Sequence, residues 1–267
     1  MSVQTLYSAA TGMTAMETKL DVIANNLANM ETTAFKKDRV NFEDLFYRHE
    51  KMPGTQDTAG LYTPTGIQIG LGSRVSSIQA EFKQGAFRET GNELDVVIEG
   101  RGFFQVMDPN GTTYYTRAGN FSKNSNGELV VGSANIGRKL QPPIMIPQDA
   151  LAISISPEGM VSVRQPANQQ MSQIGQIELA SFINPQGLLK LGENMYAETD
   201  ASGAPTLANP GQDGMGQLRQ NSLEASNVEP VQELIDLITT QRSFELNSEA
   251  VKAGDQILQT VVNLRRY

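Results

Sequence analysis

Apolar residues near the N-terminus recur at alternating steps of three and four positions. They are Leu6, Ala9, Met13, Met16, Leu20, Ile23, Leu27 and Met30. This spacing is a heptad repeat, in which one apolar stripe of a helix packs against a partner helix. It predicts a single amphipathic helix of about 25–28 residues.

A second helical pattern lies at the C-terminal end. Residues 226–229, Ser-Asn-Val-Glu, have the form of a capping box, which marks the start of a helix. Pro230 suits a first helical turn and is a second start signal, a few residues later. Arg265 and Arg266 would complement the dipole at the helix end. The pattern predicts a helix of about 33 residues. Two apolar stripes run along it, one of Leu246, Ala250, Ala253, Ile257, Val261 and Leu264, the other of Leu237, Phe244, Val251 and Leu258.

Between the two helical patterns the period becomes strand-like. Residues 94–98, 103–106, 113–116 and 128–131 are rich in β-branched and aromatic residues. Turn sequences at 108–111 and 124–127 separate them. A β-rich domain over about residues 93–221 fits this pattern best.

Residues 48–73 contain too many glycines and prolines to suggest a regular element. Structureless loops of this length are uncommon in compact domains and are usually functional. We expect this segment to become ordered only against a partner.

Together these patterns predict an α+β fold in which long N- and C-terminal helices form a discontinuous, coiled-coil-like domain around a mainly-β centre. The helical domain comprises residues 1–46 and 222–267. Residues 47–92 form an extended Gly/Pro-rich linker, and residues 93–221 form the β-rich outer domain.

Composition removes many kinds of chemistry from consideration. The chain has 267 residues, no cysteine and one histidine, His49, and its net charge is −8. Without cysteine there is no disulfide, no thiolate nucleophile and no sulfur-ligated zinc site. The acidic balance disfavours a nucleic-acid partner. We also expect no membrane-spanning helix and no cleaved secretory signal, since neither kind of apolar segment occurs.

No catalytic motif emerges from the chain. Residues 100–105, Gly-Arg-Gly-Phe-Phe-Gln, begin like a dinucleotide fingerprint, but Gln105 replaces its last glycine and no helical pattern follows. A tight turn between strands explains this run. His49 is interpreted as a solvated side chain. The sequence therefore predicts no catalytic residue, metal site, cofactor or small-molecule substrate.

The lengths of the two helices point instead to self-assembly. At 1.5 Å per residue they would measure about 40 and 50 Å, which exceeds the roughly 30 Å scale of a small domain. Much of each apolar stripe would then be exposed on a monomer, and exposed stripes of this size mark association surfaces. When two unlike surfaces mate head to tail and the rotation between copies does not close a ring, the product is a helical filament.

Several blocks of the chain resemble a known family. Residues 24–29, Ala-Asn-Asn-Leu-Ala-Asn, followed by Thr-Thr-Ala-Phe-Lys at 32–36, are similar to the N-terminal signature of bacterial flagellar axial proteins, which include rod and hook subunits. The C-terminal signature of that family is matched at 226–228, 233–235 and 241–245. Residues 94–104 and 115–121 resemble the start of its β-domain.

Within that family the length and the 47–73 stretch resemble the distal rod subunits. The resemblance implies a structural, non-enzymatic subunit that self-assembles into a rigid hollow tube, transmits motor torque to the hook and forms the export channel. Its implied partners are further copies of itself, proximal rod and hook proteins, the rod cap, the P and L ring proteins and the type III export apparatus. The implied location is the basal body, where the rod crosses the periplasm, after export without a cleaved signal.

The predicted polymer interface lies on the two terminal helices. It comprises Leu6, Met13, Met16, Leu20, Ile23, Asn25, Asn26, Leu27, Asn29, Met30, Leu237, Gln241, Arg242, Phe244, Leu246, Asn247, Val251, Ile257, Leu258 and Val261. The resemblance assigns a stiffening role to the stretch that contains Pro53, Gly54, Pro64 and Gly66. One departure is Ala34, where the family normally has glycine. If this position needs a positive φ, alanine carries a strain of about 1 kcal/mol.

Three other interpretations remain open at this stage. A proximal rod or hook subunit belongs to the same family, but the 47–73 stretch argues against it. A secreted β-rich adhesin would present an aromatic platform, whereas aromatic residues make up 6% of the chain and tryptophan is absent. A carboxylate-dependent glycan hydrolase would lose activity, but not assembly, when one Asp or Glu is replaced.

Overall fold

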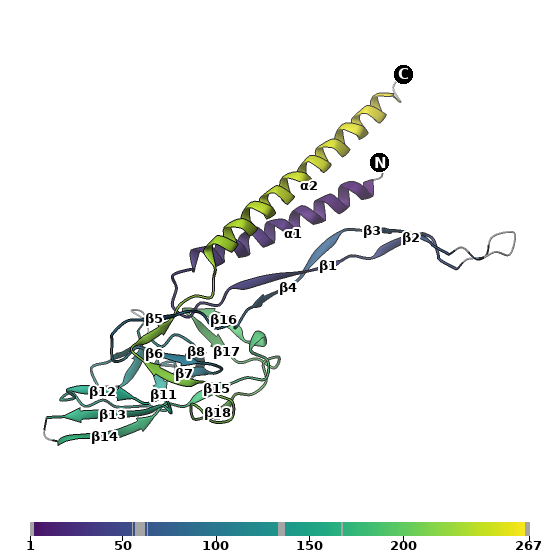
Figure 1. Cartoon of the computed structure of the whole chain (residues 1–267). Coiled ribbons are helices and arrows are strands. Elements are labelled where there is room, and N and C mark those ends of the chain that lie inside the picture. Colours follow the sequence, from purple (N-terminus) through teal and green to yellow (C-terminus); the bar gives the residue numbers. More distant parts are fainter. Residues whose placement is uncertain are drawn as a thin grey trace. The chain divides into compact units, whose positions relative to one another are not determined.

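The computed structural model describes residues 3–54, 56, 62, 64–132, 137–166 and 168–264 (Figure 1). The chain forms two compact units. Unit 1 comprises Met1–Ala28, Asp38–Ala80 and Glu229–Tyr267, and unit 2 comprises Asn29–Lys37 and Glu81–Val228. The chain therefore passes from one unit to the other four times.

Unit 1 contains the two predicted helices, α1 (Val3–Ala28) and α2 (Pro230–Leu264). They lie side by side and run antiparallel (Figure 1). Helix α2 begins at Pro230, which confirms the second of its two predicted start signals. The capping box at 226–229 precedes the helix. Helix α1 ends before Met30, so the predicted heptad stripe loses its last member to a turn.

The face that α2 turns towards α1 has an unexpected composition. Leu237, Phe244, Val251 and Leu258 are half-buried, and Thr240 and Gly254, which lie between them, are buried. Glycine is required at one point, because a Cβ on Gly254 would lie 2.4 Å from Leu6 Cδ2. The other stripe is exposed, with Leu246 66% and Ile257 37% accessible. The side chains of Val261 and Leu264, and all of Arg265 and Arg266, lie outside the described residues.

The other named elements of unit 1, among its described residues, are two antiparallel strand pairs. Strand β1 (Asp38–Asp44) pairs with β4 (Ser73–Ala80), and β2 (Tyr47–Lys51) pairs with β3 (Ile67–Gly70). Gly72, directly before β4, lies close to Ser8 and Thr11 of α1. A Cβ on Gly72 would lie 2.1 Å from Thr11 Oγ1. Helix α1 thus contacts α2 with one side and the strand segment with another.

The prediction that residues 48–73 contain no regular element is wrong, because β2 and β3 occupy parts of this range. Strand β4 and the short strand β5 (Phe87–Glu89) follow it. One of the glycines that suggested a loop, Gly66, lies where the two chains of the β2–β3 pair approach each other. A Cβ on Gly66 would lie 2.3 Å from the Lys51 carbonyl oxygen, so glycine lets the two chains pass each other closely.

Unit 2 is the predicted β-rich region. The largest sheet among the described residues has nine strands. Its main path runs β16 (Leu189–Gly192), β17 (Met195–Ala197), β8 (Thr113–Thr116), β7 (Phe103–Met107), β11 (Lys139–Gln141), β10 (Leu129–Val131) and β9 (Phe121–Lys123), with β15 (Leu179–Ser181) joining β7 to β18 (Thr206–Ala208). The strands predicted at 103–106, 113–116 and 128–131 are confirmed in this sheet.

Smaller sheets complete unit 2. Strands β12 (Ala152–Ile155), β13 (Met160–Gln165) and β14 (Asn168–Gln176) form one of three strands. Strand β6 (Val96–Glu99), predicted at 94–98, pairs with β19 (Gln217–Gln220), and β5 pairs with β20 (Ser222–Glu224). The short 3-10 helix η1 spans Pro185–Gly187. The main apolar core is built around fully buried side chains such as Phe104, Ile98 and Leu140.

Candidate assembly site

The exposed surface of α2 carries an apolar stripe with no covering element among the described residues. Leu246, Ala250, Ala253 and Ile257, one turn apart, are all exposed. We call these four residues the outer stripe. The N-terminal turns of α2 also expose Val231 (72%) and Ile238 (57%). Exposed apolar surface of this extent on one helix is typical of an interaction site.

The two strand pairs of unit 1 are a second apolar surface. Phe46 is 87% exposed, and Ile67 and Ile78 are at least half exposed. Isolated two-stranded pairs are marginally stable in water, so apolar side chains on them gain from a covering partner. Of the predicted stiffening residues, Pro53, Gly54 and Pro64 are exposed and Gly66 is half-buried.

The predicted interface residues divide between inward and outward positions. Exposed are Asn25, Met30, Gln241, Arg242, Leu246 and Ile257. Half-buried are Leu6, Met13, Met16, Leu20, Leu27, Asn29, Leu237, Phe244, Asn247, Val251 and Leu258. Ile23 and Asn26 are buried. Within one copy, therefore, most of the predicted surface is already at least partly buried, and α1 has both α2 and the β1–β4 pair as neighbours.

Asn26 has a role inside the chain that the sequence pattern did not indicate. Its Nδ2 donates to the Asp38 carbonyl oxygen at 2.9 Å and to Glu233 Oε2 at 3.3 Å. Its Oδ1 accepts a hydrogen bond from the Asp38 backbone N–H at 2.9 Å. One buried amide thus joins the end of α1, the start of β1 and the first turn of α2.

Unit 2 contains a buried cluster of charges that the sequence analysis missed. Lys36 Nζ lies 2.6 Å from Glu224 Oε1, and Arg117 Nε lies 2.9 Å from Glu224 Oε2. The Lys36 and Glu224 side chains are 0% exposed and that of Arg117 is 4% exposed. We call these three residues the ionic node. Lys36 and Arg117 stand within blocks that carry the family resemblance, but nothing in the sequence pairs them with Glu224, 188 and 107 positions away.

The remaining polar atoms of the ionic node are also satisfied. Lys36 Nζ donates to the Lys83 carbonyl oxygen at 2.7 Å, and Glu224 Oε1 accepts the Gly85 N–H at 3.0 Å. Burial lowers the pKa of the Lys36 ammonium, and the Glu224 carboxylate offsets only part of this effect. Burial alone would raise the pKa of Glu224, but the charges of Arg117 and Lys36 hold it below its ordinary value.

The ionic node lies among the segments that lead out of unit 2. Asn227 extends it, because its Oδ1 accepts the Lys37 N–H at 2.8 Å and its Nδ2 donates to the Glu81 carbonyl oxygen at 2.7 Å. Lys37, Glu81 and Val228 are the residues at which the chain crosses to unit 1. Three crossing segments are thus tied to one another on the unit 2 side.

Ala34 has a positive φ, so the condition under which alanine would be strained at this position is met. Its φ is +57°, its side chain is 1% exposed, and its N–H donates to the Glu224 carbonyl oxygen at 2.8 Å. An L-residue in this conformation carries about 1–2 kcal/mol of strain. The segment after α1 therefore turns sharply at a residue that is held against β20.

Substitutions at Ala34 should show how tightly this turn is defined. We expect Ala34→Val to lower the free energy of unfolding by about 3 kcal/mol, because a β-branched side chain adds strain and overpacks a buried site. Ala34→Gly should stay within about 1 kcal/mol of the unchanged chain, since relief of strain offsets the loss of a buried methyl group and the added chain entropy. Urea unfolding of both variants measures this. Equal stability of the two would contradict the strained turn.

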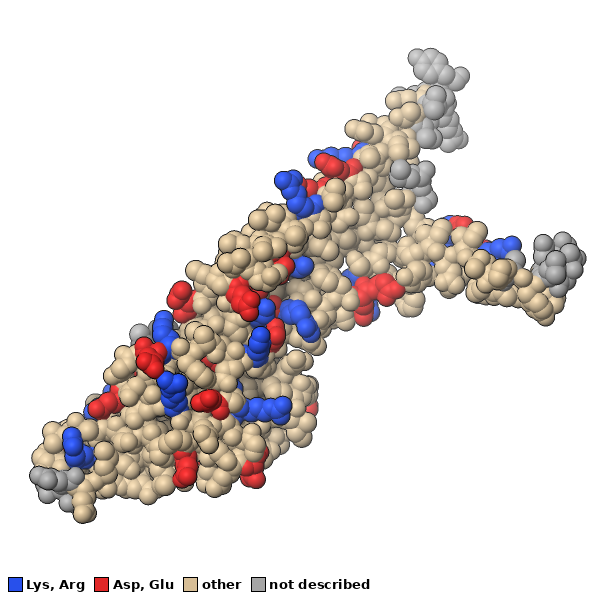
Figure 2. All heavy atoms as spheres, viewed as in Figure 1, with Lys and Arg blue, Asp and Glu red and all other residues tan. Residues whose placement is uncertain are grey.

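Charges on the surface are mixed. Figure 2 shows Lys and Arg interspersed with Asp and Glu on the face in view, without a broad patch of one sign there. Among the described residues no cluster of three His, Asp or Glu side chains could hold a metal ion. No described helix is long and apolar enough to cross a membrane.

Comparison with known proteins places the chain in a family. Three family models match: "Flagella basal body rod protein" over residues 6–36, "Flagellar hook protein FlgE/F/G D1 domain" over residues 97–163, and "Flagellar basal body rod FlgEFG protein C-terminal" over residues 219–264. The flagellar basal-body rod protein FlgG of Caulobacter vibrioides is 44% identical over 263 residues, which covers 98% of this chain and 99% of that protein. The chain belongs to the flagellar basal-body rod protein family.

Two further relatives, a rod protein and a hook protein, differ in their sequence identity to this chain. FlgG of Borreliella burgdorferi is 43% identical over 263 residues and covers 98% of each chain. The flagellar hook protein FlgE of Salmonella typhimurium is 25% identical, over 96% of this chain and 99% of that protein. The sequence identity of this chain to the two rod proteins is therefore markedly higher than its identity to that hook protein. The family resemblance expected from the sequence is confirmed.

Proposed function

We propose that the chain is a structural subunit of the distal rod of the flagellar basal body and that its copies assemble into a straight, rigid, hollow tube. The outer stripe of α2 is the observation that carries this proposal, in a chain whose relatives are named as rod proteins. Burying one leucine- or isoleucine-sized side chain stabilises by about 1.5–3 kcal/mol. Repeated in every copy, such contacts favour a polymer.

In the proposed tube, α1 and α2 form a coiled-coil-like inner domain. The inward heptad positions hold the two helices of one copy together, and the outer stripe contacts neighbouring copies. As working parts of the tube we propose a helical domain of residues 1–46 and 222–267, a stiffening stretch at 47–92 and an outer domain at 93–221. The compact units have other bounds, since residues 81–92 and 222–228 fold with unit 2. The remaining predicted interface residues contribute where they are exposed, as Asn25 and Arg242 are.

The proposed role is mechanical and not catalytic. The tube transmits torque from the motor to the hook and conducts later subunits through its channel. Its partners would be proximal rod and hook proteins, the rod cap, the P and L ring proteins and the type III export apparatus. The proposed location is the rod where it crosses the periplasm, which the chain reaches without a cleaved signal.

The stretch between β2 and β3 gives the proposal a specific test. Deleting residues 53–64 leaves Met52-Thr65-Gly66 as a three-residue connection, a common length for a strand pair. We expect this variant to polymerise into curved or flexible tubes, because the deletion removes contacts that hold neighbouring copies rigidly. Electron microscopy measures the curvature. Tubes as straight as those of the full chain would contradict the stiffening role.

A further inference from the structure

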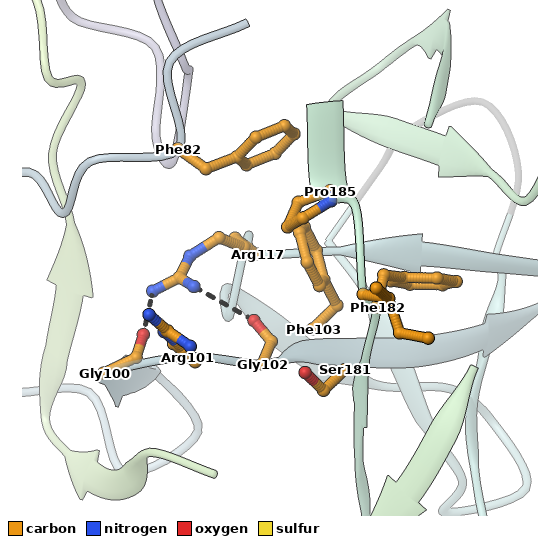
Figure 3. A pocket seen from close by; sticks show the side chains of 10 residues that line it. Phe82, Gly100, Arg101, Gly102, Phe103, Arg117, Ser181, Phe182 and Pro185 are labelled. Atoms are coloured by element: carbon orange, nitrogen blue, oxygen red, sulfur yellow. Dashed lines mark hydrogen bonds between the residues drawn. The ribbon is translucent and has the colours of Figure 1, made fainter. Parts of the chain in front are cut away.

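Unit 2 contains a cavity of about 270 Å³ that the proposed function does not yet use (Figure 3). Its walls are mixed: Phe82, Phe103, Phe182 and Pro185 contribute apolar surface, and arginine side chains and backbone contribute polar surface. The turn between β6 and β7 forms another wall. Gly100 and Gly102 have φ values of +116° and +135° there, so the wall is bare backbone.

Two arginines line this cavity, and they differ in availability. Arg117 is buried, and its guanidinium donates to Glu224 Oε2 at 2.9 Å. It also donates to the carbonyl oxygens of Gly100 and Gly102, both at 3.0 Å (Figure 3). Arg101 is exposed, and the structure gives its guanidinium no ion pair among the described residues. The cavity thus combines aromatic side chains on one part of its wall with one exposed cation, Arg101.

The volume of the cavity is better suited to a single side chain than to a larger small molecule. Small-molecule sites usually measure about 300–1,000 Å³, whereas an apolar cavity of about 150 Å³ already admits a benzene ring. A cavity of about 270 Å³ suits one leucine-sized side chain with some of its backbone. The cation at the edge favours a segment in which a carboxylate stands near that side chain.

One exposed segment of unit 2 has this composition. Leu151 is 64% exposed and does not line the cavity, and Asp149, two positions earlier, is exposed and in no ion pair among the described residues. Leu189 and Leu191 are also exposed but flank Lys190, which Arg101 would repel. Met30, next to Glu31, is exposed less, at 41%.

We propose that the cavity receives Leu151 of a second copy and that Asp149 of that copy pairs with Arg101. The contact joins two different surfaces of the same unit, so it is head-to-tail, which is the kind of contact that builds helical polymers. It adds a specific outer contact to the helix contacts of the proposed function and rests on that function.

Charge reversal in the full-length chain tests the pairing. Arg101→Asp and Asp149→Arg, each alone, should raise the critical concentration for polymerisation about five-fold or more, because each places like charges across the contact. The double variant should return to within about two-fold of the unchanged chain, since the pair is restored with opposite polarity. Light scattering at a series of protein concentrations measures this. Lys123→Asp, an equal charge change at an exposed position of β9, is the control and should have no effect.

Three other outcomes would contradict the occupant, the charge pair or the proposed function. If Arg101→Asp is rescued by Glu31→Arg and not by Asp149→Arg, the occupant is the Met30 segment and the proposal is wrong. If the double variant assembles no better than either single one, the pairing does not exist. If the unchanged chain forms no polymer while it remains folded by circular dichroism, the proposed function itself fails.

A cross-link provides a second readout that does not depend on charge. The chain has no cysteine, so Leu151→Cys combined with Ile183→Cys at the cavity introduces a single reactive pair. Mild oxidation of the assembled double variant should give a ladder of linked copies on a denaturing gel. Either single variant has one thiol and can give at most a linked dimer. The absence of any species larger than a dimer from the double variant would contradict the contact.

Discussion

Glu224→Gln is expected to lower the free energy of unfolding of the full chain by about 3–5 kcal/mol, because it leaves two buried cations without their counter-charge. Lys36 and Arg117 both lie within 3 Å of the Glu224 carboxylate, and none of the three side chains is more than 4% exposed. Urea unfolding followed by near-ultraviolet circular dichroism measures the change, since the tyrosines Tyr114, Tyr115 and Tyr196 lie in the same unit.

A matched control separates this effect from the loss of any carboxylate. Glu193 pairs with Arg138, but its side chain is 41% exposed. Glu193→Gln should therefore cost no more than about 1 kcal/mol. Lys36→Met combined with Glu224→Gln should recover part of the lost stability, because only Arg117 then remains charged. Equal effects of the two Glu→Gln variants would contradict the role of the ionic node.

The same pair of variants gives a pH signature. The pKa of Glu224 is lower in the folded chain than in the unfolded one, so its contribution is complete above its ordinary pKa of about 4.3. As the pH falls below that value the unfolded chain binds the proton first, and stability falls until the pH has passed the lower, folded pKa. Glu224→Gln removes this acid sensitivity, so its stability should fall less steeply over that range than that of the unchanged chain.

The second large effect concerns the outer stripe. Leu246→Asp combined with Ile257→Asp should leave the monomer folded, because both side chains are exposed and surface substitutions cost about 0.5 kcal/mol or less. Polymerisation should require a concentration about 100-fold higher or more, since two charges would be buried between copies. Sedimentation of the assembled fraction measures this.

The control for the outer stripe introduces the same charge change at positions of α2 outside the stripe. Gln256→Asp combined with Gln259→Asp adds the same two charges at exposed positions beside the stripe. This variant should polymerise at nearly the concentration of the unchanged chain. If both double variants assemble normally, the outer stripe is not the polymer contact.

Both helices could be predicted because their apolar period is local, but the facing side of α2 could not. The stripe that packs on α1 alternates leucine-sized residues with Thr240 and Gly254, so it is less apolar than the outer stripe. Small residues there reflect close approach of the helices, as the contact of Gly254 with Leu6 shows. A search for the most apolar stripe therefore finds the surface that one copy leaves exposed.

The candidate site was predictable only in part, for a related reason. Asn26, Lys36 and Arg117 stand in recognisable blocks, yet their partners Glu233 and Glu224 are more than 100 residues away and no local pattern connects them. The strands in residues 47–92 were missed because glycines such as Gly66 were interpreted as loop residues. They are required where two strands pass each other closely.

Electron microscopy of basal bodies from a strain that lacks this chain is the most direct test of the distal-rod assignment. We expect a short rod with rings at its base and no hook, and a rod of full length when the chain is supplied again. A complete rod without a hook, or unchanged basal bodies, would contradict the assignment.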